Sequence, residues 1–128
     1  LAKRYRFGKG SDLAPVDLAL GWGPMSDQDV LKHFKFSQSD RFYFWTTETF
    51  PIPREMIESH SANMHMIPGS PEIEKELKAL RPGHIVHVRG YLVEARGADG
   101  GRWTSSLSRT DTGRGACEIV FVESLDAN

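Results

Sequence analysis

The sequence predicts a mainly β domain with short helices, of the α+β class. Short runs rich in aromatic and β-branched residues recur along the chain, and glycine-containing turns separate the later runs. Gly90 falls in the middle of the strongest run, where a glycine marks a bulge or a sharp bend. Several short strands, together with a bend at Gly90, suggest a small, partly closed β-barrel. An oligonucleotide/oligosaccharide-binding (OB) barrel is one candidate.

The aromatic run at residues 41–47 is the first clear strand. Phe42 and Phe44 share one face of such a strand, and Tyr43 and Trp45 share the other. Because both faces are aromatic, we expect core packing and a central position in a sheet. A platform on which bases or sugars stack is the alternative. Later strands are expected at residues 84–94, 102–109 and 116–125, with loops at 97–101 and 110–115.

The clearest helix begins after Ser70, which suits the N-cap, and Pro71 suits its first helical position. Ile73, Leu77 and Leu80 recur at helical spacing, so they predict one apolar face that packs on the core.

Length and charge bound the domain organisation. The 128 residues suffice for one domain with a real core, and we expect a basic arm at residues 1–10 followed by a single globular domain at 11–128. The arm is expected to be mobile or to form an edge strand, and a juxtamembrane segment attracted to anionic lipid is the sharper interpretation. The net charge of −1 argues against strong binding to nucleic acid.

The segment at residues 59–70 is the densest in groups that bind or exchange protons. We expect it to be an ordered, nonrepetitive loop that joins two halves of the domain through hydrogen bonds, with at least one histidine pointing inward to backbone partners. His60, Asn63 and His65 are its candidate ligand-binding residues. Four residues separate the two histidines, which fits no familiar zinc motif, so we predict no metal and no cofactor. A metal site at His60 and His65 is the alternative.

A second candidate site lies in the loop that carries Arg109, Asp111 and Arg114. Turn chemistry explains the aspartate and the neighbouring glycines, while the two arginines could hold an anionic group. Cys117 is the only cysteine, which excludes an intrachain disulfide. We expect a small buried hydrophobe there, with a Cys–His dyad as the alternative.

Four sequence blocks carry a resemblance: DLALGWGPMSD, SHSANMHMIP, RGYLV and RTDTGRGACE, at residues 17–27, 59–68, 89–93 and 109–118. Together they resemble an uncharacterised bacterial family of membrane-anchored or exported proteins. The resemblance covers nearly the whole chain and brings no activity or catalytic residue. It implies a hydrophobic anchor upstream of Leu1 and a soluble domain held at a membrane, in the periplasm. A cytoplasmic location is also compatible with the sequence.

Three functions follow from these observations. The first is a non-catalytic binding or interaction module, with a protein or a small molecule as its partner. The second is a metal-assisted hydrolase that uses His60, His65 and a distant carboxylate. The third is a single-strand nucleic-acid binder, against which the net charge counts; its stacking groups would be Phe42, Tyr43, Trp45, Tyr91 and Trp103.

Overall fold

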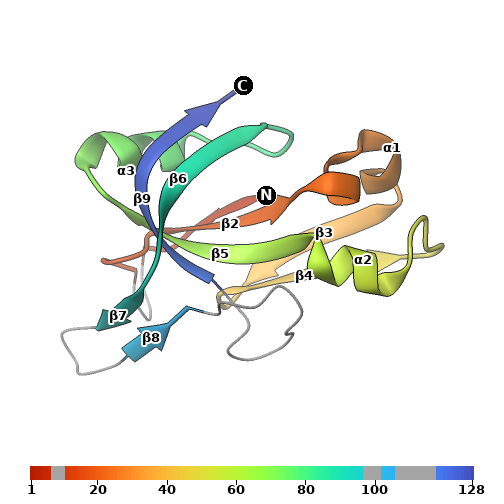
Figure 1. The fold of residues 1–128 in the computed structure, drawn as a ribbon, viewed down its shortest axis with the longest axis horizontal. Helices are drawn as coiled ribbons and strands as arrows, with labels where there is room; N and C mark the ends of the chain where they lie inside the picture. Colours follow the sequence, from red (N-terminus) through yellow and green to blue (C-terminus); the bar gives the residue numbers. More distant parts are fainter. Residues whose placement is uncertain (7–10, 97–101, 106–117) are drawn as a thin grey trace.

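The main sheet of the protein has five strands in the order β1-β2-β5-β9-β6 (Figure 1). A computed structural model describes residues 1–6, 11–96, 102–105 and 118–128. The described chain is mainly β with short helices, which confirms the predicted class. The five strands are β1 (Ala2–Arg4), β2 (Val16–Gly21), β5 (Ser61–Pro68), β9 (Glu118–Ala127) and β6 (Val86–Leu92).

The pairing leaves this sheet open. Strand β5 pairs antiparallel with β2 and parallel with β9. Strand β1 pairs antiparallel with β2, and β6 pairs antiparallel with β9. Strands β1 and β6 are therefore the two edges, and the sheets of the described chain do not close into a barrel. Strands β9 and β6 bend strongly along their length (Figure 1). The partly closed barrel and its OB variant stay predictions.

Two hairpins complete the β structure of the described residues: β3 (Phe34–Ser39) with β4 (Phe42–Thr47), and β7 (Glu94–Arg96) with β8 (Arg102–Thr104). The central position expected for the aromatic run is wrong, because β4 belongs to a two-stranded sheet. Tyr43 and Trp45 are half-buried as expected, whereas Phe44 on the other face is 51% exposed. A hairpin that lies on another layer has one covered face, so aromatic residues on both faces do not require a central strand.

In the ranges that the structure describes, four short helical segments connect the strands: the 3-10 turn η1 (Gly23–Ser26), α1 (Gln28–Leu31), α2 (Arg54–Ser59) and α3 (Pro71–Lys78). Helix α3 begins as predicted, since the Ser70 hydroxyl accepts a hydrogen bond from the Ile73 amide at 3.2 Å and Pro71 is the first residue.

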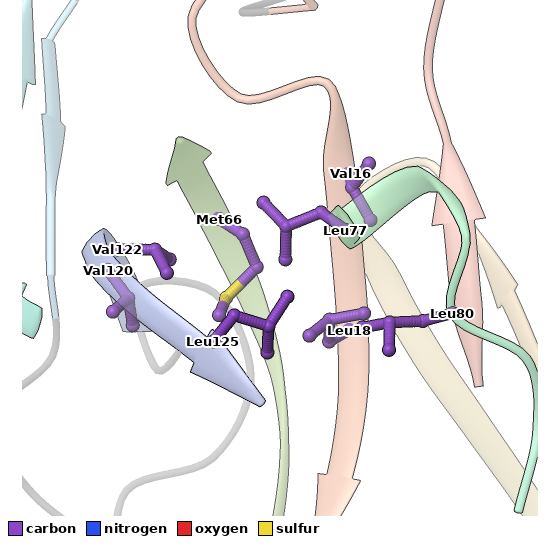
Figure 2. Close-up of a cluster of buried hydrophobic side chains, with 8 residues drawn as sticks. All are labelled: Val16, Leu18, Met66, Leu77, Leu80, Val120, Val122 and Leu125. Atoms are coloured by element: carbon purple, nitrogen blue, oxygen red, sulfur yellow. The ribbon is translucent and has the colours of Figure 1, made fainter. Parts of the chain in front are cut away.

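Helix α3 covers one face of the main sheet and buries the largest apolar cluster. Leu77 is fully buried there, and Figure 2 shows how the side chains of β2, β5, β9 and α3 meet. Truncating such a leucine to alanine costs about 2–5 kcal/mol. The buried members are Val16, Leu18, Met66, Leu77, Leu80, Val120, Val122 and Leu125.

Smaller clusters lie elsewhere in the fold. Ile67 and Ile119 pack with Ala14 and Ala95. Met25, Phe34 and Ile57 form a third cluster, which joins η1, α2 and the β3–β4 hairpin.

Gly90 produces the bend that the sequence predicts. The β6–β9 register shifts between Arg89 and Gly90, and a Cβ atom built on Gly90 would lie 1.9 Å from the carbonyl oxygen of Phe121. Only glycine allows the two backbones to approach this closely.

The nonrepetitive loop expected at residues 59–70 is wrong. Residues 61–68 form β5, which has ladder partners on both sides in β2 and β9. The segment alternates polar Ser61, Asn63 and His65 with apolar residues, and this is the period of a strand. The predicted basic arm contains β1, which is an edge strand, the second of the two expected states. None of the helices in the described ranges has the length and apolar character needed to cross a bilayer.

Candidate functional site

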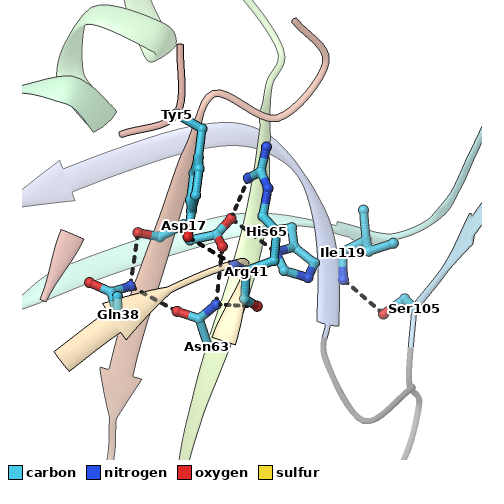
Figure 3. A network of polar contacts seen from close by, with 8 residues as sticks. All are labelled: Tyr5, Asp17, Gln38, Arg41, Asn63, His65, Ser105 and Ile119. Carbon is cyan, nitrogen blue, oxygen red and sulfur yellow. Dashed lines mark hydrogen bonds and ion pairs between the residues drawn. The ribbon is translucent and has the colours of Figure 1, made fainter. Parts of the chain in front are cut away.

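The polar cluster is centred on Asp17, whose side chain is fully buried on β2 (Figure 3). Its Oδ1 accepts hydrogen bonds from Arg41 Nη1 at 2.8 Å and from His65 Nδ1 at 2.9 Å. Its Oδ2 accepts one from Asn63 Nδ2 at 3.1 Å. Because a carboxylate only accepts, the Nδ1 atom of His65 carries the proton in this pair.

Strand register places these groups together. Asp17 pairs directly with His65 across the β2–β5 ladder, and Asn63 lies two residues before His65 on the same face. Val16 and Leu18 point to the opposite face, toward α3. The polar cluster therefore occupies the face of the sheet that α3 does not cover.

The β3–β4 hairpin covers the polar cluster on the side away from the main sheet. Gln38 Nε2 donates to Asn63 Oδ1 at 2.8 Å and to the Asp17 carbonyl at 3.3 Å. The hairpin turns through Asp40 and Arg41, which have φ values of 51° and 71°. Positive φ at both central residues is the signature of a type I′ turn, normally formed by Asn-Gly. This strained turn aims the Arg41 side chain at Asp17.

Tyr5 compensates part of that strain. Its hydroxyl accepts a hydrogen bond from the Arg41 amide at 3.0 Å, and the Arg41 guanidinium lies 3.9 Å from the centre of the Tyr5 ring. Burial raises the pKa of Tyr5, and the hydrogen bond from Arg41 lowers it by a smaller amount. Tyr5 therefore stays neutral at physiological pH.

The electrostatics of the polar cluster are those of a buried ion pair. The side chains of Asp17, Arg41 and His65 are 0%, 12% and 6% exposed. Removing one partner from such a pair leaves a buried charge uncompensated, which is strongly destabilising. An Asp–His pair also orients catalytic histidines in acid–base sites. Here Oδ1 of Asp17 accepts from His65 on β5 and from Arg41 of the hairpin, and Oδ2 accepts from Asn63 on β5. We infer that the cluster joins the two layers of the fold.

His60 lies apart from this cluster. It caps the end of α2, where its Nδ1 atom is 2.9 Å from the carbonyl oxygen of Met56 and 2.9 Å from the hydroxyl of Ser59. The prediction that one histidine points inward to a backbone partner is therefore met only in part: His60 has the backbone partner but is half-buried, while His65 is buried against a carboxylate.

The structure does not bring His60 and His65 together. In an extended strand five residues span about 16 Å. Glu118, which could have completed a metal site, pairs in register with Met64, so its side chain lies on the face opposite to that of His65. No group of three His, Cys, Asp or Glu side chains in the described ranges is arranged to hold a metal ion.

Arg109, Asp111, Arg114 and Cys117 lie outside the described residues. The anion-binding loop and the Cys–His dyad therefore stay predictions. Sequence reasoning missed Asp17 as a partner of His65, although Asp17 is a lone acidic residue in an otherwise apolar run, and such residues are buried only when paired.

A second feature, which we call the edge groove, lies along β2 where β1 no longer pairs with it. Strand β1 covers Val16–Leu18, and the groove follows the next residues of β2 toward Gly21. It has a volume of about 620 Å³. Its apolar walls come from β2, α1, β3, the segment that follows α3, and β6: Leu18, Leu20, Leu31, Phe36, Leu80, Val86 and Val88.

A short hydrogen-bond chain fixes one wall of the edge groove. Tyr43 Oη and Ser61 Oγ lie 2.7 Å apart, and Ser61 Oγ donates to the Ile57 carbonyl at 2.7 Å. Because the serine proton is used on Ile57, the tyrosine hydroxyl donates to the serine. Both side chains line the edge groove, and on this wall their hydroxyl groups already form hydrogen bonds within the protein.

Comparisons with family models, with curated proteins and with solved structures find no match to this chain, so its resemblance to a bacterial family stays a prediction.

Proposed function

We propose that this chain is a binding module and that the edge groove takes its ligand. The observation that carries the proposal is an open groove of about 620 Å³ with apolar walls. Pockets for small molecules have volumes of about 300–1,000 Å³ and mostly apolar linings with few polar groups. In this proposal the sheet is a partly closed barrel, and the groove is the opening between the β1–β2 edge and the start of β6.

The polar cluster also supports this proposal, because its own groups stabilise the fold and leave ligand binding to the edge groove. Its carboxylate, amide and imidazole groups, on β2 and β5, are directed at one another and at Arg41 in the β3–β4 turn, which is how a buried network stabilises a fold. The edge groove instead leaves apolar surface in contact with water, which costs free energy unless a ligand covers it. The resemblance to membrane-anchored or exported proteins supports a place for this module at a bacterial membrane.

A neutral apolar dye, N-phenyl-1-naphthylamine, tests the proposal by its fluorescence on titration. We expect saturable binding, weakened about tenfold by Val88→Glu, because a charge in an apolar groove is desolvated when the dye enters. Tyr91→Glu makes the same charge change on the same strand but at a 61% exposed position away from the groove, so it should leave binding unchanged. Ile85→Glu, at a groove position 67% exposed, repeats the test without disturbing the core.

Absence of saturable dye binding by the unmodified protein would overturn the proposal. So would equal losses in Val88→Glu and Tyr91→Glu, since the dye would then bind elsewhere. Circular dichroism and thermal unfolding of each variant confirm that the fold is intact.

One observation favours a second function, the binding of single-stranded nucleic acid. Phe42 and Phe44 are 39% and 51% exposed on the outer face of the β3–β4 hairpin, where Lys35 also lies. Exposed aromatic rings beside a cation are the elements of a stacking platform. Fluorescence anisotropy with labelled oligonucleotides at low salt tests it, and we expect Phe44→Ser to abolish any binding.

A further inference from the structure

The charged residues of the edge groove all have one sign. Lys32 and Arg81 line it together with His84, and none of the lining residues in the described part of the chain is aspartate or glutamate. The whole chain carries 17 acidic and 16 basic residues, so a lining without any carboxylate departs from the overall composition. A groove with apolar walls and a positive rim is complementary to a ligand with an apolar body and an anionic end.

Arg81 is the stronger of the two cations for such a ligand. Its Nη1 donates to the carbonyl oxygens of Leu80 at 2.9 Å and Lys78 at 3.3 Å, which fixes the guanidinium at the end of α3. These are neutral acceptors, and none of the ion pairs among the described residues includes Arg81. The donors on its Nε and Nη2 atoms suit a carboxylate, which guanidinium groups bind in a bidentate manner.

Lys32 has a partner of its own. Its Nζ lies 3.7 Å from Asp29 Oδ1 on α1, so an acidic group already faces this cation. Lys32 therefore provides a matched control for Arg81, since both are basic residues that line the same groove.

His84 adds a second donor beside Arg81. Its Nδ1 accepts a hydrogen bond from the Arg81 amide at 3.1 Å, so in the neutral ring the proton is on Nε2. Gly83, between the two, has a φ of 94°, a conformation that favours glycine and folds the loop back on itself. The loop thus holds a guanidinium and an imidazole N–H at one end of an apolar groove.

We propose that the edge groove binds a free long-chain carboxylate, with its head group on Arg81 and His84 and its chain along Leu20, Val86 and Val88. This inference rests on the proposed function and names the ligand class for it. The apolar walls cover the chain, and the exposed position of Arg81 lets the head group stay partly hydrated. That combination avoids the cost of burying an anion.

Competition with the bound neutral dye tests the inference in the whole protein. Dodecanoate, dodecanol and methyl dodecanoate are each titrated below their critical micelle concentrations at low ionic strength. We expect all three to displace the dye, with dodecanoate preferred over dodecanol by roughly fivefold, the size typical of an exposed ion pair. The preference should shrink in 0.5 M salt, because salt screens exposed charges.

Arg81→Gln should remove this preference while leaving dodecanol affinity within twofold of the unmodified protein. Arg81→Lys should keep part of it, since the charge remains but the bidentate geometry is lost. Lys32→Gln removes the same charge from the α1 wall and should keep the full preference.

Each outcome has a distinct meaning. Equal binding of dodecanoate and dodecanol would overturn the head-group assignment and leave the binding module intact, as would a preference lost in Lys32→Gln rather than Arg81→Gln. Dye binding that none of the three compounds displaces would overturn the ligand class. Vesicles of anionic phospholipid that bind the protein when soluble dodecanoate does not would point to a membrane surface instead. Failure of the dye itself to bind would overturn the proposed function.

Discussion

Strand β2 borders two regions that differ in how far their side chains are satisfied by partners within the protein. In the polar cluster, the fully buried Asp17 has hydrogen-bond partners on both carboxylate oxygens. In the edge groove, Leu20 lies three residues further along the same strand and keeps part of its apolar surface exposed. The residue types alone suggest the reverse roles, with polar groups as the site and apolar groups as the core. A region is available to a ligand when its side chains lack partners within the protein, whether those side chains are polar or apolar.

The largest expected effect is at the centre of the polar cluster. Asp17→Ala should lower the free energy of unfolding by about 3–5 kcal/mol, because Arg41 and His65 lose their common buried acceptor. Chemical denaturation measures it. The control Asp126→Ala removes an exposed carboxylate on β9 and should change stability by less than about 0.5 kcal/mol. Similar losses in the two variants would contradict the structural role of the polar cluster.

His65→Ala should cost less, about 1–3 kcal/mol, since it leaves one buried hydrogen bond of Asp17 unmade while Arg41 remains. His87→Ala, at an exposed position of β6, is the matched control and should be nearly neutral. Unchanged stability in His65→Ala would break the comparison, because it would assign the buried imidazole to function and not to the fold.

Substitution at the edge groove should separate binding from stability. Ile85→Ser removes an apolar side chain that is 67% exposed, so the free energy of unfolding should change by about 0.5 kcal/mol or less. Dye affinity should fall in the same variant. A large loss of stability would mean that the groove is part of the core.

The smallest effect is a pH dependence from Tyr5. Its pKa is raised in the folded protein, so the native state holds the phenolic proton more tightly than the unfolded chain does. The corresponding stability is fully present below the unfolded pKa, about 10, and is lost as pH rises through the folded pKa. Unfolding free energies between pH 9 and 11 should therefore fall more steeply in the unmodified protein than in Tyr5→Phe. Equal slopes would contradict this.

The sequence predicted what local signals encode. Ser70 and Pro71 start α3 as expected, Gly90 bends β6, and β7 pairs with β8 around the predicted hairpin loop. Each of these depends on residues within a short segment, where capping, backbone freedom and turn formation act.

The candidate site could be predicted only in part. Asn63 and His65 do meet in one cluster, but their common partner Asp17 is 46 and 48 residues away in the sequence. The alternation of polar and apolar residues at 61–66 was a strand signal, and its polar side would ordinarily face water. Here the hairpin covers it. The edge groove combines residues from distant segments, so no local pattern predicts it.

The position of β9 has a consequence for how the chain folds. This strand lies between β5 and β6, yet it follows every other strand of the main sheet in the sequence. On the ribosome, β6 therefore waits for its only ladder neighbour in that sheet until residues 118–127 have emerged. The parallel β5–β9 pairing also joins residues more than fifty positions apart, which slows folding through the entropy of loop closure. Until then β5 exposes an unpaired edge, and a nascent chain at this stage is open to pairing with a second copy.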